Sequence, residues 1–214
     1  MRNLFLFLAV LLLSSCIPVD DFGTYWKKGT VDPALLGTWV AITSPARDAD
    51  DRKEARTVRV ADKKEGMQVI NKGGTYQIDS LDEQERRKKN YIPVSARALV
   101  AGRYTFLMVI DREVNQKGRI TITRGLIRYK LEGGMFWEYS LADEPMGSFL
   151  REKYRRAKNI KKPGCKDKEL KCAFGYVRIG TLDDEVLKIL AEIPDTKEFW
   201  TDAGTYRRQA GAAR

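Results

Sequence analysis

The chain has 214 residues, a formal net charge of +10 and no histidine. The lack of histidine excludes Ser-His-Asp and Cys-His nucleophiles, His-ligated zinc and the usual general base near neutral pH. The length suits one domain with a substantial hydrophobic core.

The N-terminal residues have the layout of a secretory signal. Arg2 precedes an uninterrupted apolar run from Leu4 to Leu13. As a helix this run rises only about 15 Å, whereas the hydrocarbon core of a bilayer is about 30 Å thick, so the run does not predict a transmembrane helix. We expect a signal peptide over residues 1–15.

The end of this signal, Leu13-Ser14-Ser15-Cys16, resembles the bacterial lipobox. The resemblance implies cleavage before Cys16 and an acyl lipid such as palmitate on that cysteine. The alternative is a plain secretory signal in which Cys16 carries no lipid. Ile17 follows the cysteine where inner-membrane lipoproteins of the enteric type have Asp. The resemblance therefore implies a lipoprotein on the periplasmic face of the outer membrane rather than of the inner membrane.

The next segment, residues 16–31, shows neither a helical nor a strand period and contains Pro18, Gly23 and Gly29. This composition predicts a tether between the membrane and the folded domain. A β-rich globular domain is expected over residues 32–200.

The domain opens on Asp32-Pro33, which favours a short helical turn, and a strand is expected from Trp39 to Thr43. Gly37-Thr38-Trp39 resembles the G-x-W signature of lipocalins and related small barrels. The resemblance implies that Trp39 plugs one end of the barrel against a basic side chain. The alternative is an ordinary core tryptophan in a β-protein.

Short alternating segments follow, separated by glycine-containing turns. Pro93 suggests a strand start or an edge, and the segment around Phe106 is apolar on both faces, as in a covered central strand. Residues 82–90 suit a loop better than a helical turn. The number of strands favours a mainly β fold, an antiparallel barrel or sandwich of lipocalin-like type. The strand segments are 56–61, 67–70, 75–79, 91–100, 103–111, 119–123, 126–131 and 135–141.

The last third changes character. Helical spacing predicts a short amphipathic helix over residues 143–157, and a strand is expected over 173–179. Thr181 to Asp184 resembles a capping box, so a C-terminal amphipathic helix should run to the residue before Pro194 and cover the sheet or one barrel end. Residues 201–214 are expected to form a flexible tail.

Cys165 and Cys172 remain as an even pair if Cys16 is acylated. In an oxidising compartment we expect a disulfide between them. Two free buried thiols or a metal site are the alternatives, and we expect no metal and no cofactor.

The lipocalin resemblance implies a cup that holds an apolar ligand such as a fatty or isoprenoid chain. The same bulky residues are the natural choice for a filled core, which is the alternative. The candidate lining residues are Trp39, Tyr76, Phe106, Met108 and Trp137.

A basic stretch over residues 151–171 contains the candidate anion-binding residues Lys158, Lys161 and Lys162. Such a surface would meet lipid phosphates or acidic glycans, and the alternative is a solvated face with no ligand. Nucleic acid is not an expected partner in this compartment. No motif names a reaction, so we expect a non-catalytic envelope protein that binds an apolar or anionic ligand. An envelope scaffold or assembly factor that acts through protein contacts is the alternative.

Overall fold

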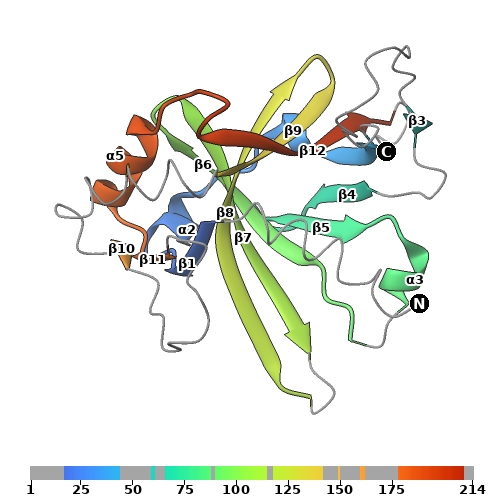
Figure 1. Cartoon of the computed structure of the whole chain (residues 1–214). Coiled ribbons are helices and arrows are strands. Elements are labelled where there is room, and N and C mark those ends of the chain that lie inside the picture. The colour runs from blue at the N-terminus through green and yellow to red at the C-terminus, as the bar shows by residue number, and fades with distance from the viewer. Residues whose placement is uncertain are drawn as a thin grey trace, which may run out of the picture.

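The computed structural model of the chain describes residues 17–43, 59–60, 66–87, 90–114, 118–141, 149, 160–161 and 178–209. Strands dominate these residues (Figure 1). In chain order the elements are β1 (Ile17–Asp21), α2 (Tyr25–Lys28), the 3₁₀ helix η1 (Pro33–Leu35), β2 (Gly37–Thr43), β3 (Arg59–Val60), β4 (Gly66–Asn71), β5 (Tyr76–Ser80), α3 (Glu83–Arg86), β6 (Val94–Ala101), β7 (Tyr104–Val114), β8 (Ile120–Glu132), β9 (Met135–Leu141), β10 (Ile160–Lys161), β11 (Arg178–Thr181), α5 (Asp184–Glu192) and β12 (Trp200–Arg208).

Eight strands close into one antiparallel barrel. Each pairs with the next along the chain in the order β2, β4, β5, β6, β7, β8, β9 and β12, and β12 returns to pair with β2. The predicted mainly β, lipocalin-like fold with a C-terminal helix is confirmed, and it is a barrel rather than a sandwich. Closure leaves the barrel itself without an edge strand.

Glycine pairs make two of the barrel turns. Gly73 and Gly74 join β4 to β5 with φ of 61° and 76°, and Gly133 and Gly134 join β8 to β9 with φ of 59° and 75°. Two successive residues in the left-handed region are the requirement of a type I′ hairpin turn, which only glycine meets without steric cost.

The barrel has a core on each face of β7, as the sequence predicts for a covered strand. Leu107 and Val109 point into the barrel, whereas Tyr104, Phe106 and Met108 belong to a second core on the outer face. Both cores use the period-2 alternation of the same strands.

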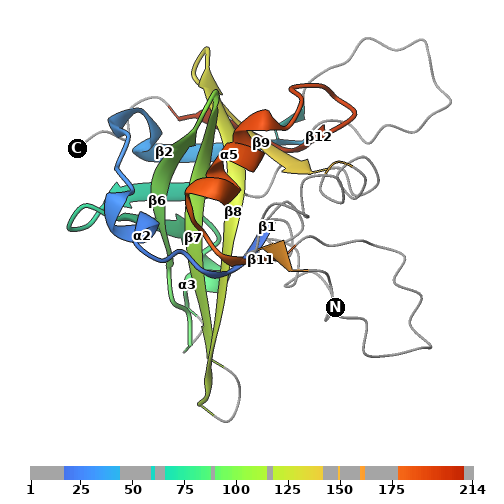
Figure 2. The same cartoon turned by 90° about the vertical axis from the view of Figure 1, so that its left-hand side faces the viewer.

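Helix α5 covers this outer face, and Figure 2 shows it crossing the strands β6, β7 and β8. Asp183 caps the helix by accepting a hydrogen bond from the Val186 amide, with 2.8 Å between Oδ1 and N. The buried side chains of the helix are those of Val186, Ile189 and Leu190. The predicted C-terminal amphipathic helix is therefore present, and it covers the sheet with its apolar face inward.

Residues 17–31 differ from the predicted tether, because β1 is part of the sheet. Ile17 pairs antiparallel with Leu126 of β8, and Val19 pairs parallel with Ile179 of β11. Ile17, Val19, Phe22 and Tyr25 are all buried in the outer core. Only two apolar residues, Ile17 and Val19, alternate with Pro18 and Asp20. Two such positions are too few for the alternation to reveal a strand in the sequence.

Residues 201–208 also differ from the predicted flexible tail, because β12 completes the barrel between β2 and β9. Among residues 201–208 only Tyr206 is buried, so the hydrophobic pattern is too weak to reveal a strand. Backbone pairing on both sides supplies the order instead.

The remaining predictions of secondary structure have mixed outcomes. The strand expected after Pro93 begins at Val94, whereas Glu83–Arg86 forms the helical turn rather than the favoured loop. Except for Phe149, the predicted helix over 143–157 lies outside the described residues, as does most of the predicted strand over 173–179. In the part of the chain that the structure describes, no helix combines the length and apolar character needed to cross a bilayer.

Candidate functional site

The barrel is closed at the end where β2 begins. Trp39 is only 2% exposed, its Nε1 donates to the Leu35 carbonyl oxygen at 2.8 Å, and its ring lies 5.9 Å from that of Phe136. The Arg208 guanidinium carbon lies 5.6 Å from the centre of the Trp39 ring, and Arg208 also donates to the Leu36 carbonyl. This contact agrees with the basic partner that the G-x-W resemblance implies for Trp39.

The five residues expected to line one cup are not brought together. Trp39 and Tyr76 belong to the core inside the barrel, whereas Phe106 and Met108 belong to the core on the outer face. Trp137 is half-buried and pairs with Lys130 and Thr205, between the inward-facing Phe136 and Glu138. Alternation therefore directs Trp137 outward.

The interior is packed with aromatic rings. Phe136 lies 5.9, 5.6 and 5.5 Å from the rings of Trp39, Tyr129 and Tyr206. The Tyr76 hydroxyl both donates to the Asp32 carbonyl and accepts from the Asp32 amide, and burial raises the pKa of Tyr76 to about 12. Burial also raises the pKa of Tyr129. These contacts favour a filled core over an open cup.

A cavity of about 520 Å³ lies where β8 continues beyond the start of β7, and its lining includes Tyr129 and Leu131 of the interior core as well as Arg128. Its charged lining comes from the strands β8 and β12, from the turn between β6 and β7, from the residue that caps η1 and from the connection between α5 and β12. The charged residues are Arg103, Arg128, Lys130, Lys197, Asp32, Asp195 and Asp202. Basic groups therefore outnumber acidic ones in the lining.

Arg128 of β8 stands in an aromatic cage, which we define as the rings of Tyr104, Tyr139 and Trp200. The Arg128 guanidinium carbon lies 4.3, 4.6 and 4.4 Å from the centres of these three rings. The residue is only 7% exposed. Cation–π attraction stabilises a charge that burial would otherwise penalise, and it is worth about 2 kcal/mol or more when the cation is desolvated.

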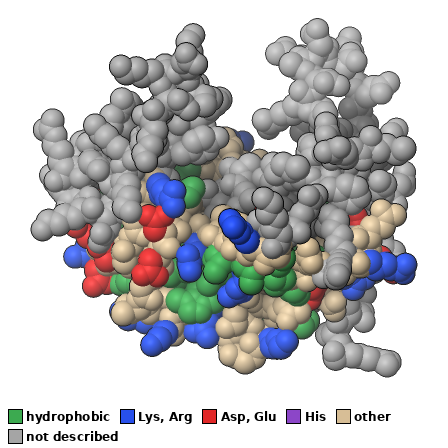
Figure 3. All heavy atoms as spheres, turned by 90° about the horizontal axis from the view of Figure 1, so that it is seen from below, with side chains coloured by type: hydrophobic (Ala, Val, Ile, Leu, Met, Phe, Trp, Pro, Cys, Tyr) green, Lys and Arg blue, Asp and Glu red, His purple; other side chains and the backbone are tan. Residues whose placement is uncertain are grey.

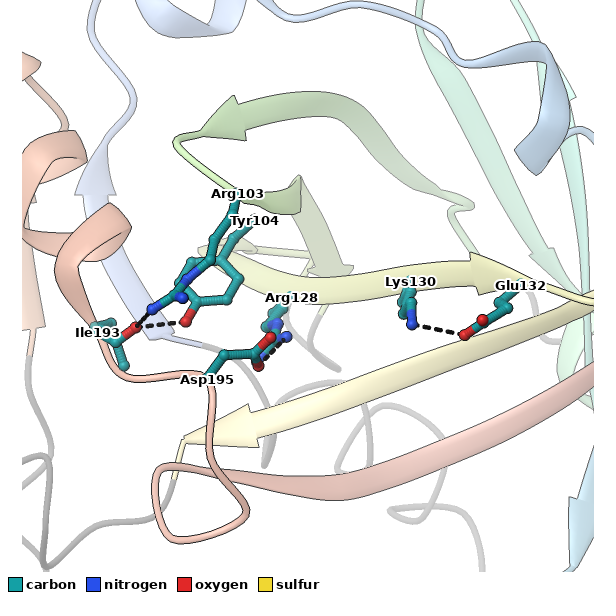
Figure 4. Close-up of polar contacts among 7 residues, drawn as sticks. All are labelled: Arg103, Tyr104, Arg128, Lys130, Glu132, Ile193 and Asp195. Carbon is teal, nitrogen blue, oxygen red and sulfur yellow. Dashed lines mark hydrogen bonds and ion pairs between the residues drawn. The ribbon is translucent and has the colours of Figure 1, made fainter.

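The polar contacts of Arg128 are incomplete. Its Nη2 donates to Asp195 Oδ1 at 2.7 Å (Figure 4). Its Nη1 and the Trp200 Nε1 are buried and have no hydrogen-bond partner among the described residues. A buried donor without a partner costs about 1–3 kcal/mol, which marks this position as one that the fold does not fully satisfy.

The connection that carries Asp195 is tied to the barrel at Ile193. Arg103 Nη2 donates to the Ile193 carbonyl at 3.2 Å, and the Tyr104 hydroxyl donates to the same oxygen (Figure 4).

Lys130 lies at the rim, 2.6 Å from Glu132 Oε2, and this hydrogen bond raises the pKa of the exposed Lys130 ammonium. Burial raises the pKa of the Tyr139 hydroxyl at the cavity wall.

The remaining predicted site residues lie mostly outside the described residues, namely Cys16, Cys165, Cys172, Lys158 and Lys162. Lys161 is in β10, where it pairs with Arg178, and Arg178 forms an ion pair with Asp20. Among the described residues no cluster of carboxylates and cysteines has the arrangement of a metal site.

Sequence reasoning missed Arg128. The only signal was that Arg128 directly follows the apolar pair Leu126 and Ile127 within a predicted strand. Comparison with protein-family models, with curated proteins and with solved structures finds no match.

Proposed function

We propose that this chain is a non-catalytic, lipid-anchored protein of the cell envelope that binds a small anionic ligand in the cavity beside Arg128. The barrel serves as a rigid support, and its filled interior is not the ligand site. The observation that carries the proposal is a buried arginine, held in an aromatic cage, with one guanidinium nitrogen that has no hydrogen-bond partner among the described residues.

Cavity size and chemistry support a small ligand. About 520 Å³ falls within the roughly 300–1,000 Å³ typical of small-molecule sites. Aromatic and apolar walls from Tyr139, Trp200 and Leu131 offer contact area, and Arg103, Lys130 and Lys197 add positive charge around it. This combination suits an anion attached to a flat or apolar body.

Thermal unfolding of the purified protein tests the proposal with three ring compounds of similar size. Phenyl phosphate and benzoate at millimolar concentration should raise the melting temperature, because a ligand that binds only the folded state stabilises it. Neutral benzamide should not. Equal shifts for all three compounds, or no shift for any, would contradict anion binding.

The membrane anchor is tested separately. Radiolabelled palmitate should enter the wild-type protein and not the Cys16→Ser variant, and the label should fractionate with the outer membrane. A wild-type protein without label would remove the lipid anchor from the proposal and leave the anion site to be judged by its own experiment.

A second function is favoured by the hairpin of β7 and β8, which projects beyond the barrel (Figure 1). Ile120 and Ile122 are 60% and 46% exposed there, and the face seen from below mixes hydrophobic with basic side chains (Figure 3). Such a surface suits contact with an envelope protein. Crosslinking in cells should then give adducts with the wild type that Ile120→Ser and Ile122→Ser lose.

A further inference from the structure

We propose that the Asp195 carboxylate is an internal stand-in for the ligand, and that an incoming carboxylate or phosphate displaces it from Arg128. This inference rests on the proposed function, because it concerns how the same site is opened. It assigns Asp195 the role of a gate on the Arg128 cavity.

The first argument is the geometry of the ion pair. Asp195 uses one oxygen on one nitrogen, Oδ1 on Nη2, and leaves Nη1 without a partner. A carboxylate or phosphate with two free oxygens can bind Nη1 and Nη2 together in the paired arrangement that arginine favours. The ligand would therefore satisfy a buried donor that Asp195 leaves unsatisfied.

The second argument is the difference in exposure between the two partners. The Arg128 side chain is 8% exposed, whereas the Asp195 side chain is 50% exposed. Asp195 can turn into water with its hydration largely in place, whereas Arg128 has no comparable alternative. Displacement therefore moves the carboxylate and leaves the cage intact.

The third argument is the way the connection is held on both sides of Asp195. On one side, the Ile193 carbonyl is bound by Arg103 and Tyr104. On the other side, the amides of Phe199 and Trp200 donate to the Thr196 carbonyl at 3.1 and 3.0 Å. Movement is thereby confined to the short stretch that carries Asp195, so the gate opens without disturbing α5 or β12.

A purely structural role for the pair makes a different prediction. If the contact only fastens the α5–β12 connection to the barrel, loss of the Asp195 charge lowers stability and changes anion affinity no more than loss of any nearby carboxylate. Asp202 provides that comparison, because it lines the same cavity while Arg128 pairs with Asp195.

The experiment is a calorimetric titration of phenyl phosphate into the wild type, Asp195→Asn and Asp202→Asn, each checked for a cooperative melt. We expect Asp195→Asn to bind about fivefold more tightly, the factor set by the strength of a half-exposed ion pair. Asp202→Asn should gain less than about twofold, since its charge acts only through screened attraction. Asp195→Ala, which also removes the acceptor oxygen, should gain at least as much as Asp195→Asn and serves if the latter fails to fold.

The outcomes separate the two proposals. Equal gains for the Asp195 and Asp202 variants would overturn the gate while the anion site stands. Absence of binding to the wild type and to both Asp195 variants would overturn the gate and the proposed function together.

Discussion

The core inside the barrel and the core on its outer face are both rich in aromatic residues, yet they use them differently. Inside, the rings of Trp39, Tyr129 and Tyr206 pack around Phe136, an apolar centre. Outside, the rings of the aromatic cage surround the charged Arg128. The comparison teaches that similar clusters of rings can surround an apolar side chain or a charged one, and the proposed anion site rests on the charged centre.

The largest effect expected from this comparison is on the interior. Phe136→Ala should lower the free energy of unfolding by about 3–5 kcal/mol, because it removes the ring that three others contact and leaves a cavity. Trp137→Ala is the matched control on the same strand, and its half-buried, outward side chain should cost clearly less. Urea denaturation measures both, and equal losses would mean that the interior is not the packed core described above.

Alkaline pH tests the interior through Tyr76. The pKa of Tyr76 is about 12 in the folded protein, above the ordinary value of 10.0. The contribution of the neutral hydroxyl to the free energy of unfolding is therefore complete below about pH 10 and is lost as the pH rises to about 12. The loss attributable to Tyr76 should stay below about 3 kcal/mol, since the shift is about two pKa units and each unit corresponds to about 1.4 kcal/mol. Urea midpoints measured from pH 9 to pH 12 should fall less steeply in Tyr76→Phe. An identical slope in both proteins would argue against a buried Tyr76 hydroxyl.

The outer cage should be less sensitive. Arg128→Met should change the free energy of unfolding by about 1 kcal/mol or less, because an apolar chain of similar length fills the cage and leaves Asp195 half in water. A loss as large as that of Phe136→Ala, measured in the same urea series, would show that Arg128 holds the fold together rather than a ligand.

The smallest effect concerns Asp111, which is on the same face of β7 as the inward Leu107 and Val109. Burial raises the pKa of the Asp111 carboxyl above its ordinary 3.8, so ionisation near neutral pH works against folding. Asp111→Asn should therefore raise stability at pH 7 by a few tenths of a kcal/mol and should lose this advantage below pH 4. A stability gain that is the same at both pH values would contradict this cause.

The sequence predicts those parts of the fold that local patterns encode. Alternation around Val69 and Ile78 reveals strands, and the two-sided apolar run around Phe106 reveals a covered strand. Helix α5 is predicted, but Asp183 caps it, whereas Thr181 of the expected capping box ends β11. Strand β1 escapes prediction because only Ile17 and Val19 of its five residues are buried, and β12 because backbone pairing rather than a hydrophobic run orders it.

The site depends on contacts that no local pattern carries. Alternation shows that Phe106 and Met108 lie on the same face of β7. Because both faces of β7 are apolar, the sequence does not reveal which face lies inside the barrel. Arg128 meets Tyr104, Trp200 and Asp195 only because β7, β8, β12 and the α5–β12 connection converge in the folded barrel. Arg128 next to the apolar Leu126 and Ile127 is the one clue that the sequence offers.

The most direct test of the central claim is the dissociation constant of phenyl phosphate for the wild type and for Arg128→Met, measured by calorimetry. Arg86→Met is the matched control, since Arg86 is exposed on α3, which Figure 1 shows on the other side of the barrel from α5. We predict at least a tenfold loss for Arg128→Met, as expected when a buried charge-assisted contact is removed, and no change for Arg86→Met. Equal affinities of the wild type and Arg128→Met would contradict the assignment of Arg128 as the anion-binding residue.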